Sequence, residues 1–134
     1  MNQQQARAQM MVWWILWAAF QSGIVILYHN LSTAATGQPQ SESLSSSVWY
    51  AALVPAAISA VIRWLVLPRI RIAQTALVVF IIGIATAEMT CFLGLFIFPA
   101  HQQELFQVSL LGIFQFLPYY VRRYFPPDDQ EMNS

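Results

Sequence analysis

Long apolar stretches alternate with short polar breaks along the whole chain, and this alternation predicts its elements. An α-helix needs roughly 20 apolar residues to cross a bilayer at a rise of about 1.5 Å per residue. Four stretches approach that length, over residues 10–28, 48–67, 73–98 and 102–121. The fourth has more polar ends than the other three. The pattern therefore predicts an all-α fold, an integral membrane bundle of four helices.

The breaks between these stretches carry residues that end helices. Residues 30–47 are rich in Ser, Thr, Gln, Gly and Pro, and we expect a solvated loop there because such a segment buries little apolar area. Pro68 and Pro99 each follow an apolar stretch, and proline cannot continue a helix. We expect a single transmembrane domain over residues 1–125, with antiparallel up-down topology, and a polar tail over residues 126–134.

The arginines indicate how the chain is threaded through the bilayer. All of them fall before the first stretch, near the junction of the second and third, or after the fourth, at Arg7, Arg63, Arg69, Arg71, Arg122 and Arg123. The first and third connections have none and carry Glu42 and Glu104 instead. Cytoplasmic loops hold the excess of arginine and lysine in membrane proteins. The distribution therefore predicts that both termini are cytoplasmic.

Composition argues against a water-soluble fold and against several chemistries. Hydrophobic residues make up 57% of the 134 residues and charged residues only 9%, whereas soluble domains have about 45–50% and about 25%. A net charge of zero leaves no basic surface for nucleic acid. Cys91, His29 and His101 are not spaced as metal ligands, and no catalytic triad or phosphate-binding glycine loop occurs. We expect no enzyme activity, no cofactor and no metal.

Glu88 is the residue that the apolar pattern does not explain. It lies roughly 22 Å and roughly 15 Å from the two ends of its stretch, too deep for its carboxyl to reach water. A low dielectric favours the neutral form of such an acid, and an acid inside a membrane is a candidate functional group. Depth along the helices makes Gln107, Gln21 and Ser22 its candidate neighbours. We expect an interior polar cluster that binds a proton or an ion.

Three other residues in the apolar stretches have simpler interpretations. Arg63 precedes the end of the second stretch by four residues, so we expect its head group to extend to the interface. Gln115 lies near the cytoplasmic face, where partial hydration lowers the cost of an amide. Cys91 is expected to be a small apolar filler.

Small residues recur at helical spacing in the second and third stretches. The two stripes are Ala52, Ala56 and Ala60 on one helix and Gly83, Ala87, Thr90 and Gly94 on the other. Small side chains let membrane helices approach closely and gain van der Waals contact. We expect the two stripes to face each other in a tight hairpin across the turn at Pro68.

The second and third stretches, with the basic turn between them, resemble the proteolipid c-type subunit of rotary ATP synthases. Ala87-Glu88 followed by Gly94-Leu95 is similar to that family's outward-running helix, in which a carboxylate at mid-membrane precedes a Gly-Leu or Gly-Val pair. The resemblance implies that Glu88 binds and releases a transported proton or sodium ion. It covers less than half of the chain, which adds a helix at each end.

Three functions are compatible with these features. The first is a subunit of a membrane assembly, as a homo-oligomer or with other proteins, in which Glu88 is a proton- or ion-linked carboxyl. The second is an accessory membrane protein whose protonated Glu88 only donates a hydrogen bond between helices, and the third is a small proton-coupled transporter. All three predict a multi-pass protein whose solvent is the lipid bilayer, and the location expected is the inner membrane of a bacterium.

Overall fold

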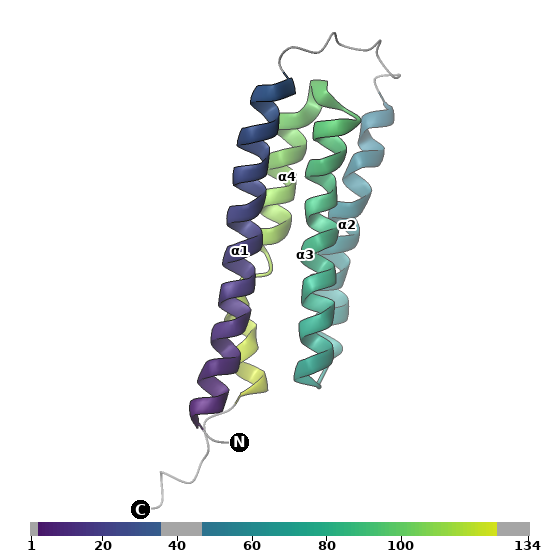
Figure 1. The fold of residues 1–134 in the computed structure, drawn as a ribbon. Coiled ribbons are helices and arrows are strands. Elements are labelled where there is room, and N and C mark those ends of the chain that lie inside the picture. The colour runs from purple at the N-terminus through teal and green to yellow at the C-terminus, as the bar shows by residue number, and fades with distance from the viewer. Residues whose placement is uncertain (1–2, 36–46, 126–134) are drawn as a thin grey trace, which may run out of the picture.

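The computed structural model describes residues 3–35 and 47–125, and these segments are helical apart from short turns. Four α-helices lie side by side along one long axis (Figure 1). They are α1 (Gln3–Ala35), α2 (Val54–Val61), α3 (Ala73–Phe96) and α4 (Gln102–Phe114). No strand occurs in the described segments, so this part of the chain is all-α as predicted.

Three helical stretches are long and apolar enough to cross a membrane, as expected of a membrane protein. They cover Gln4–Thr33, Val48–Arg69 and Ala73–Phe96. The first is longer than predicted, because α1 continues through residues 30–35, where we expected loop. Within this extension the Asn30 side-chain amide donates to the carbonyl of Ile26 at 2.8 Å, one turn back along the helix. Residues 36–46 and 126–134, with Glu42 and the predicted tail, lie outside the described residues.

The second stretch is one rod whose helical pitch changes along its length. It starts as the 3-10 helix η1 (Val48–Leu53), continues as α2, and widens into the π-helix η2 (Ile62–Val66). It ends as the 3-10 helix η3 (Leu67–Arg69), which contains Pro68. Short π-helical turns are rare and often mark functional sites. The residues of η2 are therefore candidates for a functional role.

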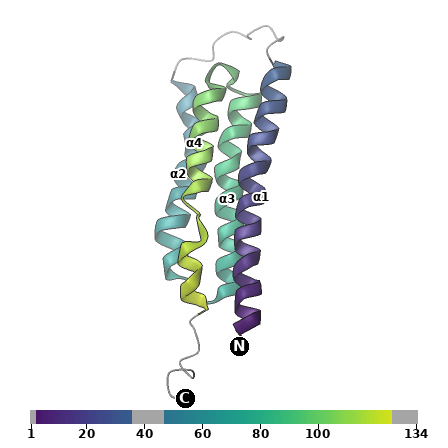
Figure 2. The ribbon, with the colours of Figure 1, turned by 90° about the vertical axis from the view of Figure 1, so that its left-hand side faces the viewer.

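The fourth stretch is interrupted, although the sequence predicted one helix over residues 102–121. It follows the short 3-10 helix η4 (Pro99–His101), and α4 ends at Phe114. After an irregular link, the chain resumes as the 3-10 helix η5 (Pro118–Tyr124), and Figure 2 shows the narrow link between the two. Proline lacks an N–H and its ring clashes with the carbonyl four residues earlier, which here belongs to Phe114. Pro118 therefore ends the helix.

The tightest packing joins α3 to α4, which passes back along it. A Cβ atom at Gly94 would lie 2.9 Å from the Cβ of Leu105, and one at Gly112 would lie 2.9 Å from the Cβ of Ala87. At Gly83 the ring of Phe116 fills the space that a side chain would need. These distances leave no room for a further methyl group between the helices.

These contacts correct the predicted pairing of the small-residue stripes. The stripe on α3 lies mainly against α4, because Ser109 and Gly112 give α4 a small face of its own. On the second stretch, Ala52 is buried while Ala56 and Ala60 are only partly buried. Ser59 rather than the alanines makes the polar contact from α2 to α3.

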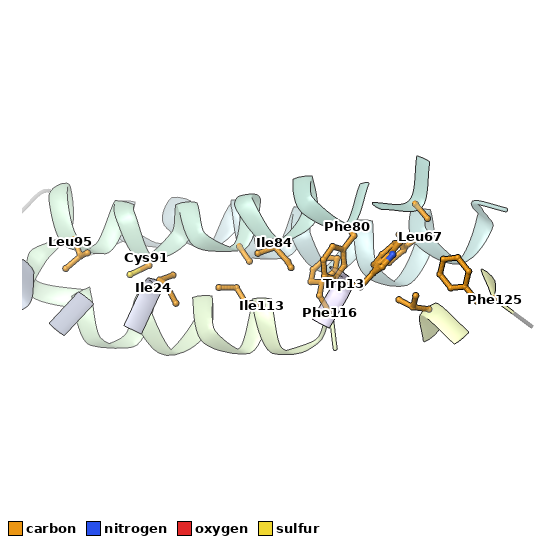
Figure 3. Packing of buried hydrophobic residues seen from close by; sticks show 13 residues of the cluster. Trp13, Ile24, Leu67, Phe80, Ile84, Cys91, Leu95, Ile113, Phe116 and Phe125 are labelled. Atoms are coloured by element: carbon orange, nitrogen blue, oxygen red, sulfur yellow. The ribbon is translucent and has the colours of Figure 1, made fainter. Parts of the chain in front are cut away.

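Helix α1 packs against both α3 and α4 and completes the core. Buried apolar side chains form one cluster along the bundle axis, from Leu95 at one end to Phe125 at the other (Figure 3). The rings of Trp13 and Phe80 meet near its middle, with centroids 4.9 Å apart. Many large hydrophobic residues outside the cluster are exposed, as on a surface that faces lipid.

Candidate functional site

Glu88 lies at the margin of the core. It is about 22 Å from the start of α3 and about 12 Å from its end, close to the depth that the sequence predicted. The preceding Ala87 is fully buried against α4, and consecutive residues of an α-helix are about 100° apart, which turns Glu88 away from α4. The Glu88 side chain is partly exposed and makes no hydrogen bond or ion pair within the described segments.

Two of the predicted neighbours of Glu88 do not join it in an interior cluster. Ser22 is exposed, and its hydroxyl donates to the carbonyls of Ala18 and Ala19 at 2.7 and 3.2 Å, within its own helix. Gln107 is exposed as well and makes no hydrogen bond to Glu88. Depth along a helix fixes the level of a residue, but its angular position decides which neighbour it meets. The prediction used depth alone.

Gln21 is the predicted neighbour that lies level with Glu88. Trp13 packs on Phe80, and α1 and α3 run in the same direction in Figure 1. Gln21 follows Trp13 along α1 by the same number of positions as Glu88 follows Phe80 along α3. Gln21 and Glu88 therefore lie at the same level of the bundle. The Gln21 Oε1 atom is buried without a hydrogen-bond partner in the described segments, and no hydrogen bond joins it to Glu88.

A second polar group lies between α2, α3 and the end of α4, and the sequence analysis did not predict it. The buried Ser59 hydroxyl donates to the carbonyl of Gly83 at 2.9 Å. The Gln115 side-chain amide donates to Ser59 Oγ at 3.4 Å, and Trp64 Nε1 donates to Gln115 Oε1 at 3.2 Å. Ser59 and Gln115 therefore connect three helical segments inside the apolar bundle.

Arg63 is the charged member of this group, and its head group makes contacts within the protein. Its Nε donates to the main-chain carbonyl of Gln115 at 2.6 Å. Its guanidinium lies over the ring of Tyr120, 4.3 Å from the centroid, and 5.2 Å from that of Trp64. The Tyr120 hydroxyl is buried and has no partner among the described side chains. Arg63 lies in the π-helix η2, which faces the interrupted end of α4.

Donors from two other helices satisfy carbonyls at the interruption of α4. The last carbonyls of a helix lack intrahelical donors, and lipid supplies none. Arg63 donates to the carbonyl of Gln115, and Trp17 Nε1 of α1 donates at 3.1 Å to that of Ile113, which also accepts the Phe116 N–H at 3.0 Å. The signal in the sequence was Pro118, which requires free carbonyls a few residues earlier and hence donors from elsewhere.

Replacing Trp17 with phenylalanine tests this role of the indole. We expect the free energy of unfolding to fall by about 1 kcal/mol, because the carbonyl of Ile113 loses its side-chain donor but keeps the Phe116 N–H, while most of the ring contact remains. Unfolding followed by circular dichroism in a mild detergent measures the change. Trp14→Phe is the matched control, since Trp14 makes no hydrogen bond within the described residues. Equal losses in the two variants would show that the indole N–H of Trp17 has no special role.

The end of the bundle that carries η5 is rich in arginine. Arg123 donates to the carbonyl of Leu67 at 2.7 Å, and the Tyr124 hydroxyl donates to that of Ile70 at 2.8 Å. These bonds hold η5 against the turn between the second and third stretches. Arg7 and Arg122 line one cavity at the same end.

Carboxylates do not balance these arginines within the described segments. Glu88 and Glu104 are the two acids there, and the single ion pair links His101 Nδ1 to Glu104 at 3.9 Å, at the other end of α4. In the same segments, no group of three or more His, Cys, Asp and Glu residues could hold a metal ion. Comparisons with protein family models, curated proteins and solved structures find no match to this chain.

Proposed function

We propose that this chain is a subunit of a larger membrane assembly and presents Glu88 to a neighbouring subunit. The observation that carries this proposal is the partly exposed Glu88 side chain, which has no partner within the described segments although it lies far from both ends of α3. An acid in hydrocarbon is costly unless a polar or charged group meets it, and lipid tails offer neither. A second copy of this chain or a different subunit supplies that group.

The proposal includes four crossings of the bilayer, antiparallel in order, with both termini on the cytoplasmic side. Its support is the arginine-rich end of the bundle, where the start of α1, the turn after η3 and η5 lie together (Figure 1). The excess of arginine marks the cytoplasmic side of membrane proteins. With 13 residues, α4 is about 20 Å long, and η5 with 7 residues adds about 14 Å. Together they are long enough for an interrupted fourth crossing.

Within this assembly we propose that Glu88 exchanges a proton with the neighbouring subunit. Next to Glu88, Ala87 packs closely against Gly112, so this face of α3 is covered by α4. Glu88 lies at the margin of the bundle, where a neighbouring subunit can reach it. A carboxyl that alternates between its neutral and ionised forms at an interface is also the role that the resemblance to the c-type proteolipid implies.

Mass and proton flux, measured on the Glu88→Gln variant, test the two parts of the proposal separately. Glutamine keeps the hydrogen-bonding shape of the neutral acid but cannot release a proton. We therefore expect the variant to keep the native mass of the assembly in mild detergent and to lose proton flux when the assembly is reconstituted in vesicles. Glu104→Gln is the matched control, because it removes an exposed acid, and we expect it to change neither result.

Two outcomes would contradict the proposal in distinguishable ways. A native mass equal to that of one 15.2 kDa chain, with no co-purified protein, would rule out the assembly. If such a single chain still carried a flux that depends on Glu88, the small proton-coupled transporter would be the correct function. Unchanged flux in Glu88→Gln at the native mass would leave an accessory subunit in which Glu88 is only structural.

A further inference from the structure

A cavity of about 390 Å³ opens between the first turns of α1 and η5, and neither the fold nor Glu88 accounts for it. Arg7 comes from α1 and Arg122 from η5, so two different segments bring two positive charges to one site. The rest of the wall is mainly apolar and aromatic, with Met10, Met11, Trp14 and Tyr119 among its members. The rings of Trp14 and Tyr119 meet edge to face with centroids 5.6 Å apart.

The two guanidinium groups of the cavity are not neutralised by described residues. Neither Arg7 nor Arg122 makes a hydrogen bond or ion pair there, and both side chains are exposed. The two acids of the described segments lie elsewhere, with Glu88 about 22 Å up α3 and Glu104 at the far end of α4. Arginine pairs well with phosphate because its planar group donates two parallel hydrogen bonds. The cavity is therefore complementary to an anion.

The position and the lining of the cavity identify the kind of anion. It lies at one end of the apolar stretches, where tryptophan and tyrosine typically mark the membrane interface. Its charges are at the rim, and its wall continues along the apolar side of α1 through Met10, Met11 and Trp14. A free inorganic anion would use only the arginines, whereas a phospholipid would use both parts. Basic sites between membrane helices on the cytoplasmic side bind anionic head groups in this way.

We propose that this cavity binds one anionic phospholipid, with its phosphate between Arg7 and Arg122 and an acyl chain along Met10, Met11 and Trp14. The lipid ties α1 to η5 and so supports the interrupted fourth segment. The inference needs the helices to be in a bilayer, but it does not depend on the role of Glu88.

Native mass spectrometry of the detergent-solubilised protein, titrated with phosphatidylglycerol or with phosphatidylcholine, tests the proposal. We expect one phosphatidylglycerol to remain bound to each chain and phosphatidylcholine to bind more weakly. In the double variant Arg7→Gln, Arg122→Gln the affinity for phosphatidylglycerol should fall roughly 25-fold, because each arginine near an anionic surface contributes a factor of about five. The matched control is Arg69→Gln, Arg71→Gln, which removes two exposed arginines at the same end, and it should keep its lipid.

Three results would overturn the proposal. Equal losses in the two double variants would show that only overall charge attracts the lipid. Displacement of the lipid by millimolar inorganic phosphate would identify a site for free anions. Absence of lipid from the full chain, with binding after truncation at residue 126, would assign the cavity to the acidic residues Asp128, Asp129 and Glu131 of the same chain.

Discussion

Replacing Arg63 with methionine should lower the free energy of unfolding by about 2–3 kcal/mol. Methionine fills a similar volume but cannot donate to the carbonyl of Gln115, which Arg63 Nε meets at 2.6 Å. It also removes the contact of the guanidinium with the ring of Tyr120, 4.3 Å from the centroid. The carbonyl then lies at an interrupted helix with no donor from lipid. Unfolding by a denaturing detergent, followed by circular dichroism, measures the loss.

Two further variants separate the hydrogen bond of Arg63 from its charge. Arg69→Met removes the same charge from an exposed position near the same end of the bundle, and we expect it to leave stability nearly unchanged. Arg63→Lys keeps the charge but lacks the planar group that can donate to the carbonyl while lying on the tyrosine ring, so it should restore only part of the stability. Similar losses for Arg63→Met and Arg69→Met would contradict the assignment.

The substitution Gly112→Leu should lower the free energy of unfolding by about 3 kcal/mol, which is the upper part of the range for an overpacked core. A Cβ atom at Gly112 would already lie 2.9 Å from the Cβ of Ala87, and a leucine would force α3 and α4 apart. The separation would also break the hydrogen bond from the buried Ser109 hydroxyl to the carbonyl of Ala87, now 2.8 Å long. The same detergent unfolding experiment measures the effect.

Gly23→Leu is the matched control for Gly112→Leu. A Cβ at Gly23 meets nothing within 4 Å, so a leucine there should be tolerated. A compensating pair gives a sharper test, because Gly112→Ala combined with Ala87→Gly moves one methyl group across the interface. This pair should be more stable than Gly112→Ala alone. If the two glycine-to-leucine variants unfold alike, the close approach of α3 and α4 does not limit stability.

Local features of the chain predicted its membrane character, its helices and most of their ends. Runs of apolar residues predicted three spans that the structure contains, and Pro68 and Pro99 lie at the ends that they predicted. The extent of α1 was underestimated, because the polar residues from Asn30 onward stay helical, and Asn30 itself donates to a carbonyl of the same helix. The interruption before Pro118 was missed because a strongly apolar run hid the effect of a single proline.

The neighbours of each polar side chain could not be predicted in the same way. Depth placed Gln107 level with Glu88 and Gln21 and Ser22 slightly nearer the cytoplasmic side, yet none of them is hydrogen-bonded to Glu88, and Ser22 donates to its own helix. Arg63 and Gln115 each had a simple explanation near the interface, and neither one indicated the other. Their contact depends on the angle and register between helices, which the spacing within one helix does not contain.

The sequence by itself determined that this protein is suited to a lipid bilayer. The length of its apolar stretches and the scarcity of its charges can be read from the chain without knowing the fold. It also determined that a carboxyl lies deep in the third stretch and that the first and third connections carry no arginine. Only the tertiary structure decided that α3 packs most closely on α4, that Arg63 meets the interrupted helix, and that Glu88 lies at the margin of the core. These outcomes depend on how complete helices fit together, because close packing is settled by all of the facing side chains at once.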